Sequence, residues 1–532
     1  MQRKKVLLVY PEFPLSYWGF QYSLPMFGKK AMHPPLSLCT VAALCPQDWD
    51  FRLIDLNIES LSDDQIRWAD MVFVTAMGIQ HRSLFDVLAR ARAMGKMTVL
   101  GGPYASGSAD RCVGRADVCV LDEAEITMKP FLEDLAAGTP KPAYRTDKKP
   151  DVSTSPCPRY DLLKLGAYSV IDVQYSRGCP FNCEFCDIIE LYGRVPRTKT
   201  PEQMIKEFQT LYDLGYRGPV FLVDDNFIGN KKNVRVLLKS IIPWQQAHDF
   251  PFFLTTEASV NLAEDAPLLE DMRHAGFKRV FVGIETPSVE SLKETQKYQN
   301  TRKPLVEAVQ TLIDSGLEVS GGFIVGFDND TEDIFQRQID FIEQAEIPWA
   351  MVGTLTAIPA TQLWRRLEKE GRILGFADGD QFGRPNFKTK MDPEVLYQGY
   401  LRLLAHLYKP ENYYRRVLDV IARQERANHP NLHASNYPVF KIFLLSIMTM
   451  FRLGVVSEYR QHFWTFIATV LKKHPRKYVQ ALINAVTGHH FIRYTKEVLT
   501  RQRQLLPRHE ATELATQTLA TAQQEARARA NA

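Results

Sequence analysis

Short β-rich runs alternate with helical patterns along the first 140 residues, and this alternation restricts the fold more than any other feature. Each run ends at a turn, and one intervening stretch, residues 84–93, has apolar side chains at helical spacing. The runs are VLLVY (6–10), FRLIDL (51–56), MVFVTAM (71–77), TVLGGP (98–103) and DVCVLDE (117–123). Strands that alternate with helices form a parallel sheet with right-handed crossovers. We therefore predict a doubly wound, Rossmann-like α/β domain over residues 1–140.

A second series of such runs follows a segment rich in Pro, Lys, Ser and Thr, which we interpret as a linker over residues 141–164. The second series predicts six strands, at 170–175, 219–225, 252–257, 279–285, 319–327 and 350–357. Six β/α units favour a partial (β/α)6 barrel over residues 165–375, two units short of the closed eightfold form. In both series polar groups stand at strand ends, where parallel sheets bind ligands.

Helical periodicity replaces the strand signals after residue 375. We predict a mainly α-helical domain over residues 376–505 and a flexible tail over residues 506–532. The chain of 532 residues carries a net charge of +4, which gives no argument for a nucleic-acid partner. The first apolar run is five residues long and reads as a strand rather than a signal peptide. Eight cysteines without a secretory signal indicate a reducing cytoplasm.

Three of those cysteines, Cys179, Cys183 and Cys186, lie within eight residues in the pattern C-x3-C-x2-C, on a loop that follows the first strand of the second series. A cubane iron–sulfur cluster held by three cysteines keeps one iron open for a ligand. A structural zinc site needs four protein ligands, and Cys157 or a histidine would have to supply the fourth. The spacing therefore favours an iron–sulfur cluster, with zinc as the alternative.

The cysteine pattern, its position on the loop and the six downstream β/α units resemble the radical S-adenosylmethionine (SAM) superfamily. The resemblance implies a [4Fe–4S] cluster whose open iron binds SAM and reductively cleaves it to a 5′-deoxyadenosyl radical. Phe185, between the second and third cysteines, matches the aromatic position near the adenine. Further SAM contacts implied at the strand ends are Asp225, Asn226, Glu257, Glu285, Gly322 and Gly326. A carboxylate at a strand end also commonly caps a helix or forms an ion pair.

A Rossmann-like domain ahead of such a barrel resembles the cobalamin-binding radical SAM proteins. The cobalamin contacts that this resemblance implies are Met77, Gln80, Gly101, Gly102, Pro103 and Glu123. The D-x-H-x-x-G motif, whose histidine binds cobalt in many cobalamin enzymes, is absent from the sequence. His33 and His81 lie on the relevant loops, but a lone loop histidine is more often a surface or capping residue. A domain that binds nothing and shields the barrel is the alternative.

The whole arrangement, with its helical C-terminal domain, is shared with the hopanoid C-2 methylases. It implies a cobalamin-dependent C-methyltransferase that acts on an unactivated carbon of a hydrophobic, isoprenoid-like small molecule. The alternative is a radical SAM oxidoreductase, cyclase or rearrangement enzyme with a non-methylating or vestigial cobalamin domain. A cluster used only for sensing or scaffolding is disfavoured by the accompanying SAM-contact pattern. Methylthiotransferases are disfavoured because the remaining cysteines are not spaced for a second cluster. The catalytic residues stay unassigned, and the reaction requires a reductant such as flavodoxin or ferredoxin.

The most apolar stretch is residues 442–456, which is interrupted by Arg452 and too short to span a membrane. The simpler interpretation is a buried core helix. The alternative is a surface for a lipid-like substrate, with the basic run at residues 472–477 beside an anionic membrane. That alternative would make a cytoplasmic protein peripheral at the inner face of the membrane. His489 and His490 are interpreted as capping or exposed residues.

Overall fold

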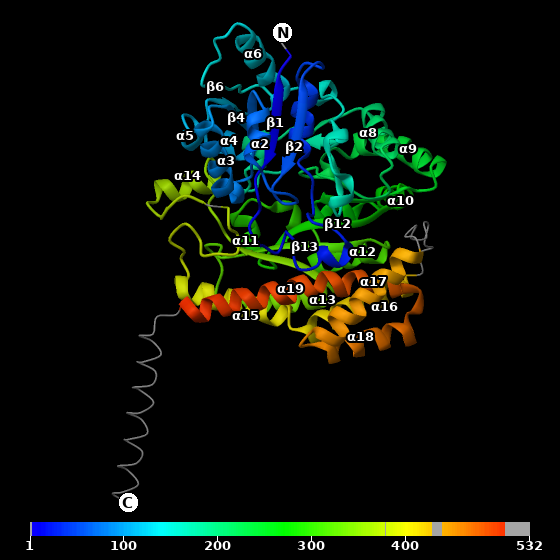
Figure 1. Cartoon of the computed structure of the whole chain (residues 1–532). Helices are drawn as coiled ribbons and strands as arrows, with labels where there is room; N and C mark the ends of the chain where they lie inside the picture. The colour runs from blue at the N-terminus through cyan, green and yellow to red at the C-terminus, as the bar shows by residue number, and fades with distance from the viewer. Residues whose placement is uncertain (1–2, 378, 428–438, 506–532) are drawn as a thin grey trace, which may run out of the picture.

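The chain forms two parallel six-stranded sheets and a layer of C-terminal helices, in a computed structural model that describes residues 3–377, 379–427 and 439–505. In the view of Figure 1 the first sheet lies at the top, the second sheet lies in the middle and the C-terminal helices lie at the bottom. This arrangement confirms the predicted α/β class, with a Rossmann-like sheet, a partial barrel and a helical C-terminal region.

The first sheet is entirely parallel, with strand order β2-β1-β3-β4-β5-β6. Helices cover both of its faces, so its central strands are buried on both sides, and every side chain of β3 is buried. The strands are β1 (Lys5–Tyr10), β2 (Asp50–Asp55), β3 (Met71–Thr75), β4 (Met97–Gly101), β5 (Val118–Val120) and β6 (Ala143–Tyr144). The helices are α1 (Leu36–Leu44), α2 (Asp63–Trp68), α3 (His81–Ala93), α4 (Pro103–Gly107), α5 (Ala109–Cys112) and α6 (Ala124–Ala136). Strand β6 lies inside the stretch predicted as a linker.

The second sheet is also parallel, with order β14-β13-β12-β11-β10-β7, so β7 and β14 are its edges. Its strands are β7 (Ile171–Val173), β10 (Gly218–Leu222), β11 (Phe252–Ala258), β12 (Phe277–Glu285), β13 (Glu318–Val325) and β14 (Trp349–Thr354). The helices between them are α7 (Ile188–Tyr192), α8 (Pro201–Asp213), α9 (Lys231–Ala247), α10 (Ala266–His274), α11 (Val289–Glu294), α12 (Leu305–Asp314) and α13 (Ile334–Gln344). A two-stranded ribbon, β8 (Ser176–Arg177) with β9 (Arg197–Thr198), follows β7 and was not predicted.

A segment between β1 and α1, which we call the N-terminal strip (residues 12–33), crosses the open side of the partial barrel. At the β14 edge, the ring centroid of Phe20 lies 5.7 Å from that of Trp349. At the β7 edge, Nδ1 of His33 lies 2.9 Å from Oδ1 of Asp172, and Ala31 bridges to Tyr168 just before the strand. The strip therefore occupies the gap that the two absent β/α units of a closed barrel would fill.

The C-terminal region is helical, as predicted, and packs on the outside of the barrel and on the N-terminal strip. It consists of α14 (Gln362–Lys369), α15 (Pro393–Leu407), α16 (Pro410–Arg426), α17 (Val439–Phe451), the π-helical turn η9 (Arg452–Val456), α18 (Arg460–Lys473), the turn η10 (Pro475–Lys477) and α19 (Tyr478–Leu505). No helix in the described ranges is long and apolar enough to cross a membrane. The predicted tail over residues 506–532 lies outside the described residues, and the domain boundaries stay predictions.

Candidate functional site

The loop that carries the three clustered cysteines is fixed at its start by two neighbouring carboxylates. Asp224, which follows β10, accepts hydrogen bonds from the backbone N–H of Tyr175 at 2.8 Å and of Ser176 at 3.0 Å. Asp225 accepts from the N–H of Gly178 at 2.9 Å. Gly178 has φ of +93°, and a Cβ there would lie 2.8 Å from a backbone oxygen, so only glycine fits this turn. The position of the loop is thus set by the adjoining strand.

Each of two cysteine sulfurs receives a side-chain amide hydrogen bond. Asn226 Nδ2 lies 4.0 Å from the sulfur of Cys179, and Gln299 Nε2 lies 3.7 Å from that of Cys183. Burial raises the pKa of the Cys179 and Cys186 thiols. Amide donors of this kind stabilise the thiolates that bind metal and tune a cluster's potential.

The described ranges contain no group of three or more His, Cys, Asp or Glu side chains arranged to hold a metal ion. In a cubane cluster each thiolate binds a different iron, so the thiols need not converge on one point. Cys157 contacts Thr210 through a 3.6 Å hydrogen bond and packs against the hydrophobic core. The donor set of three thiols on one loop, with amide donors behind two of them, fits a [4Fe–4S] cluster.

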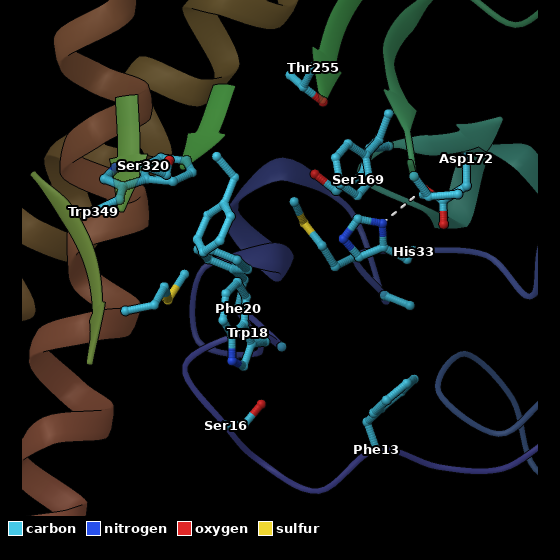
Figure 2. Close-up of a pocket in the computed structure, with 18 of the residues that line it drawn as sticks. Phe13, Ser16, Trp18, Phe20, His33, Ser169, Asp172, Thr255, Ser320 and Trp349 are labelled. Atoms are coloured by element: carbon cyan, nitrogen blue, oxygen red, sulfur yellow. Dashed lines mark hydrogen bonds and ion pairs between the residues drawn. The ribbon is translucent and has the colours of Figure 1, made fainter. Parts of the chain in front are cut away.

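A cavity of about 2840 Å³ begins at this loop and runs through the interior of the partial barrel. Cys186 and Phe185 line it at the carboxyl ends of the strands, and Arg279 and Glu318 line it at the amino ends of β12 and β13. The N-terminal strip forms one wall. Figure 2 shows Trp18 and Phe20 of the strip between Trp349 on one side and the hydrogen-bonded pair of His33 and Asp172 on the other.

Three acidic groups near the loop hold their protons unusually strongly. Burial raises the pKa of Asp224 to about 6, and of Asp225 and Glu257 to about 7. The carboxylates also raise one another's pKa through mutual repulsion. Glu257 lines the cavity, whereas Asp225 and Asn226 lie behind the loop and support its backbone and Cys179.

Glu285 ends β12 at a backbone φ of +66° and forms a buried ion pair with Lys297. Burial acts to lower the pKa of Lys297, but the Glu285 carboxylate outweighs it, so the lysine stays charged. The Lys297 Nζ atom also lies 5.9 Å from the centre of the Phe185 ring. Glu285 lines the cavity, and Lys297, which the sequence analysis missed, positions it.

The two glycines predicted to approach the adenine differ in position. Gly322 on β13 lines the cavity. Gly326 follows β13 at φ of +101°, where its N–H donates to Asp330 at 2.8 Å and its Cα faces Leu396. Gly326 therefore shapes the turn that ends the strand and lies outside the cavity lining.

The structure separates the residues predicted to contact cobalamin into two groups. Met77, with 52% of its side chain exposed, and Pro103 line the cavity near His81. Gln80 is buried, accepts from the Met77 N–H at 2.9 Å and donates to the Pro11 carbonyl at 2.6 Å. Gln80 therefore supports the backbone at Met77 and Pro11, and its contact with cobalamin stays a prediction.

Gly101 and Gly102 also lie outside the cavity lining, and internal packing explains both glycines. A Cβ on Gly101 would lie 2.9 Å from the Val120 carbonyl oxygen. A Cβ on Gly102, which has φ of +90°, would lie 2.0 Å from Oγ1 of Thr75. The glycines therefore allow neighbouring strands to approach closely, and their contact with a ligand stays a prediction.

Glu123 joins the end of the first sheet to the β8–β9 ribbon through a buried ion-pair cluster. Its carboxylate accepts from Arg177 at 2.9 Å and from Arg197 at 2.8 Å, and Arg177 also donates to Glu125 at 2.8 Å. The Glu123 side chain is 2% exposed and both of its oxygens are occupied. Glu123 connects the first sheet to the cysteine loop, and its contact with cobalamin stays a prediction.

The histidine predictions have mixed outcomes. His33 and His81 both line the cavity, and Nδ1 of His81 lies 3.0 Å from the Gly78 carbonyl oxygen. His489 and His490 are buried within α19, where burial lowers the pKa of each to about 4. Nε2 of His490 lies 2.9 Å from the carbonyl oxygen of Ser16 in the N-terminal strip. The prediction of capping or exposed histidines at 489 and 490 is wrong, because the strip and α18 cover them.

Comparisons with known proteins match the chain over nearly its whole length. The profile of the Radical SAM superfamily matches residues 173–342, and a domain of unknown function (DUF4070) matches residues 361–504. The uncharacterized methyltransferase sll1242 of Synechocystis is 40% identical, covering 93% of this chain and 92% of its own. The hopanoid C-2 methylase of Rhodopseudomonas palustris is 34% identical, covering 93% and 94%.

Among solved structures, the radical SAM methyltransferase TsrM of Kitasatospora setae, with cobalamin and a [4Fe–4S] cluster bound, superposes with a TM-score of 0.57. The match covers 93% of this chain and all of TsrM at 15% identity. At that identity the match establishes a shared fold.

Proposed function

Because the chain belongs to the radical SAM methyltransferase family that includes hopanoid C-2 methylase, we propose that it is a cobalamin-dependent C-methyltransferase. Its substrate is an apolar, isoprenoid-like small molecule, which is methylated at an unactivated carbon. The observation that carries the proposal is the single cavity. It joins the cysteine loop, the carboxyl edge of the first sheet at Met77 and Pro103, and the barrel interior. Two cofactors and a substrate would meet in that one space.

In this proposal Cys179, Cys183 and Cys186 bind a [4Fe–4S] cluster, and Asn226 and Gln299 donate hydrogen bonds to its sulfur ligands. When bound, the cluster, SAM and cobalamin supply the radical and methyl-transfer chemistry that no side chain can provide. The protein's part is to orient the groups and to exclude water.

The cavity-facing residues of the predicted SAM set are Phe185, Glu257, Glu285 and Gly322, and we assign them to SAM. Phe185 offers a ring to the adenine, and Glu257 offers a carboxylate to the ribose hydroxyls. Lys297 holds Glu285 in place through their buried ion pair. Asp225 acts indirectly, by holding the loop at Gly178.

For cobalamin we assign Met77 and Pro103, which face the cavity from the first sheet. His81 lies beside them but its Nδ1 is directed at a backbone carbonyl. Because the sequence lacks the D-x-H-x-x-G motif, we propose no histidine ligand to cobalt.

The substrate proposal is supported by the relative's printed activity, hopanoid methylation, and by the barrel walls. Aromatic side chains dominate the middle of the cavity, with Trp18 and Phe281 in contact at 5.3 Å between ring centroids. The His33–Asp172 pair and Ser320 add a few polar groups, which would fix the orientation of a mainly apolar ligand.

The reaction consumes two SAM molecules and two electrons for each methyl added. One SAM supplies the methyl group and leaves as S-adenosylhomocysteine, and the other takes the substrate hydrogen and leaves as methionine and 5′-deoxyadenosine. A low-potential one-electron donor of the flavodoxin or ferredoxin type would supply the electrons. We also propose that the protein works at the cytoplasmic surface of a membrane, the source of an apolar substrate.

The test is anaerobic reconstitution with iron, sulfide, cobalamin and SAM that carries a deuterated methyl group, followed by reduction and addition of lipid extract. We expect equal amounts of 5′-deoxyadenosine and S-adenosylhomocysteine, and a product that contains the deuterated methyl. Cys186→Ala should abolish 5′-deoxyadenosine and limit S-adenosylhomocysteine to at most one equivalent per bound cobalamin, whereas the control Cys157→Ala should retain both. If 5′-deoxyadenosine forms without S-adenosylhomocysteine or deuterium transfer, the methyltransferase proposal fails and the alternative radical SAM reactions are favoured.

A further inference from the structure

Helix α17 exposes a stripe of large apolar side chains on one face. Its members repeat at intervals of three and four residues, as expected for one side of a helix. They are Phe440, Phe443, Leu444, Ile447 and Phe451, each between 47% and 72% exposed. The apolar stretch is therefore not the buried core helix that the simpler interpretation of the sequence predicts.

Further exposed apolar side chains lie on the turn η9, which directly follows α17, and on helix α18. Val455 and Val456 of η9 are 59% and 58% exposed, and Trp464 and Leu471 of α18 are 45% and 53% exposed. The Trp464 indole donates to the Gly454 carbonyl at 2.9 Å and lies where a Cβ on Gly454 would be. We call these nine side chains on α17, η9 and α18 the apolar face. It holds nine of the eighteen exposed large hydrophobic side chains found among the described residues.

The chain around the apolar face is strongly basic. Residues 439–477 contain seven Lys or Arg and one Glu, in a chain whose net charge is only +4. That single acid, Glu458, pairs with Lys496 at 2.5 Å. Lys472 and Lys473 are exposed at the end of α18. Such a combination of aromatic, aliphatic and basic side chains suits the surface of an anionic bilayer.

The opposite side of α17 lines the cavity. Ile442, Leu445 and Met448 contribute to its wall, together with Arg476 and Gln480 from the following elements, and Leu444 at the border of the exposed stripe also lines it. One helix thus separates the apolar face from the barrel interior. Along β12 the cavity extends from Arg279 to Glu285, about 20 Å at the usual rise of about 3.3 Å per residue. An elongated apolar molecule entering beside α17 would reach the cysteine loop at the far end.

We propose that the apolar face docks on an anionic lipid bilayer and that an apolar ligand enters the cavity from the bilayer beside α17. The ligand class rests on the proposed function, whereas the docking does not. A protein partner would not require the excess of basic residues, and the absence of a spanning helix among the described residues leaves a surface contact as the mode of binding.

The docking is tested by sedimentation of the intact protein with vesicles. We expect binding to vesicles of phosphatidylglycerol and phosphatidylcholine at low salt, and weak binding to pure phosphatidylcholine. The double variant Phe443→Ser, Ile447→Ser should weaken binding at least tenfold, and Lys472→Glu, Lys473→Glu should weaken it only for the anionic vesicles. The control Val236→Ser removes a 51% exposed apolar side chain from α9 and should leave binding unchanged.

Equal binding of the wild type and the Phe443→Ser, Ile447→Ser variant would overturn the docking. So would a wild-type dimer in solution that this variant converts to a monomer, because the face would then join two copies of the chain. Neither measurement requires cofactors, so a negative result leaves the proposed methyl transfer standing.

Entry beside α17 is tested with cis-parinaric acid, an elongated fluorescent lipid, as the probe. Leu445→Trp should lower its affinity at least fivefold by filling the cavity mouth. The matched control Ile447→Trp enlarges a side chain on the exposed side of the same helix and should leave probe affinity unchanged. Unchanged probe affinity in Leu445→Trp, with vesicle binding retained, would refute entry beside α17.

Discussion

The substitution Glu123→Gln should loosen the junction between the first sheet and the cysteine loop. Glu123 is buried, and its two carboxylate oxygens receive hydrogen bonds from Arg177 and from both terminal nitrogens of Arg197. Glutamine keeps the shape of the side chain but removes the charge and directs an amide N–H₂ group at a guanidinium.

The expected loss in the free energy of unfolding depends on the hydrogen bonds that each arginine keeps after the substitution. Arg177 keeps its two hydrogen bonds to Glu125. Arg197 keeps the carbonyls of Pro150 and Tyr192 but loses the carboxylate that pairs with it. Breaking a buried ion pair costs about 3–5 kcal/mol. Because Arg177 stays paired, we expect the free energy of unfolding to fall by about 2–4 kcal/mol.

The assay is urea unfolding of the metal-free protein, with cobalamin binding measured in parallel. The control Glu394→Gln breaks a pair with Arg384 in which both side chains are about half exposed, and it should cost less than about 1 kcal/mol. A loss below about 1 kcal/mol for Glu123→Gln, together with selective loss of cobalamin affinity, would refute the structural role. It would favour Glu123 as the cofactor contact that the sequence predicts.

Three further predictions concern single residues. Burial raises the pKa of Glu257 to about 7, and the ionised form accepts ribose hydroxyls best. The affinity of the reconstituted protein for SAM should therefore rise about tenfold from pH 6 to pH 8. In Glu257→Gln the rise should be less than twofold. If the wild type and the variant show the same dependence of SAM affinity on pH, Glu257 does not contact SAM. Gly102→Ala should lower the free energy of unfolding by about 2 kcal/mol or more, because the residue has a positive φ and no room for a Cβ. The control Gly107→Ala should be nearly neutral, because its added Cβ would meet open space. Lys297→Met should leave Glu285 buried without its cation and cost about 3 kcal/mol in unfolding by urea, and a neutral result would contradict the importance of that pair.

The alternation of apolar runs with helical patterns was sufficient to predict both sheets. The strands of a parallel sheet are buried on both faces, so they appear in the sequence as short apolar runs. The short strands β6 and β8 were missed, since two residues give no periodicity. The cysteine loop was found because its ligands are close in sequence. The Glu123–Arg197 pair joins residues 74 positions apart, and no local pattern reports such a contact.

The cavity walls were the least predictable part of the site. The N-terminal strip is irregular over most of its length, so its role in closing the barrel left no periodic signal. The exposure of α17 was missed for a related reason. A run of apolar residues is the same whether it faces a core, a cavity or the outside, and only the packed structure distinguishes them.

The N-terminal strip also has a consequence for the order in which the protein is made. Tyr22 contacts His490, 468 residues later, through a 3.4 Å hydrogen bond. At 5–20 residues per second a ribosome needs roughly 25–90 s to synthesise the intervening chain. Throughout that time the strip, with Tyr17 and Phe20, lacks its final partners on α19. These aromatic residues leave the ribosome early and are covered late, so a nascent chain stalled before α19 would present them to chaperones.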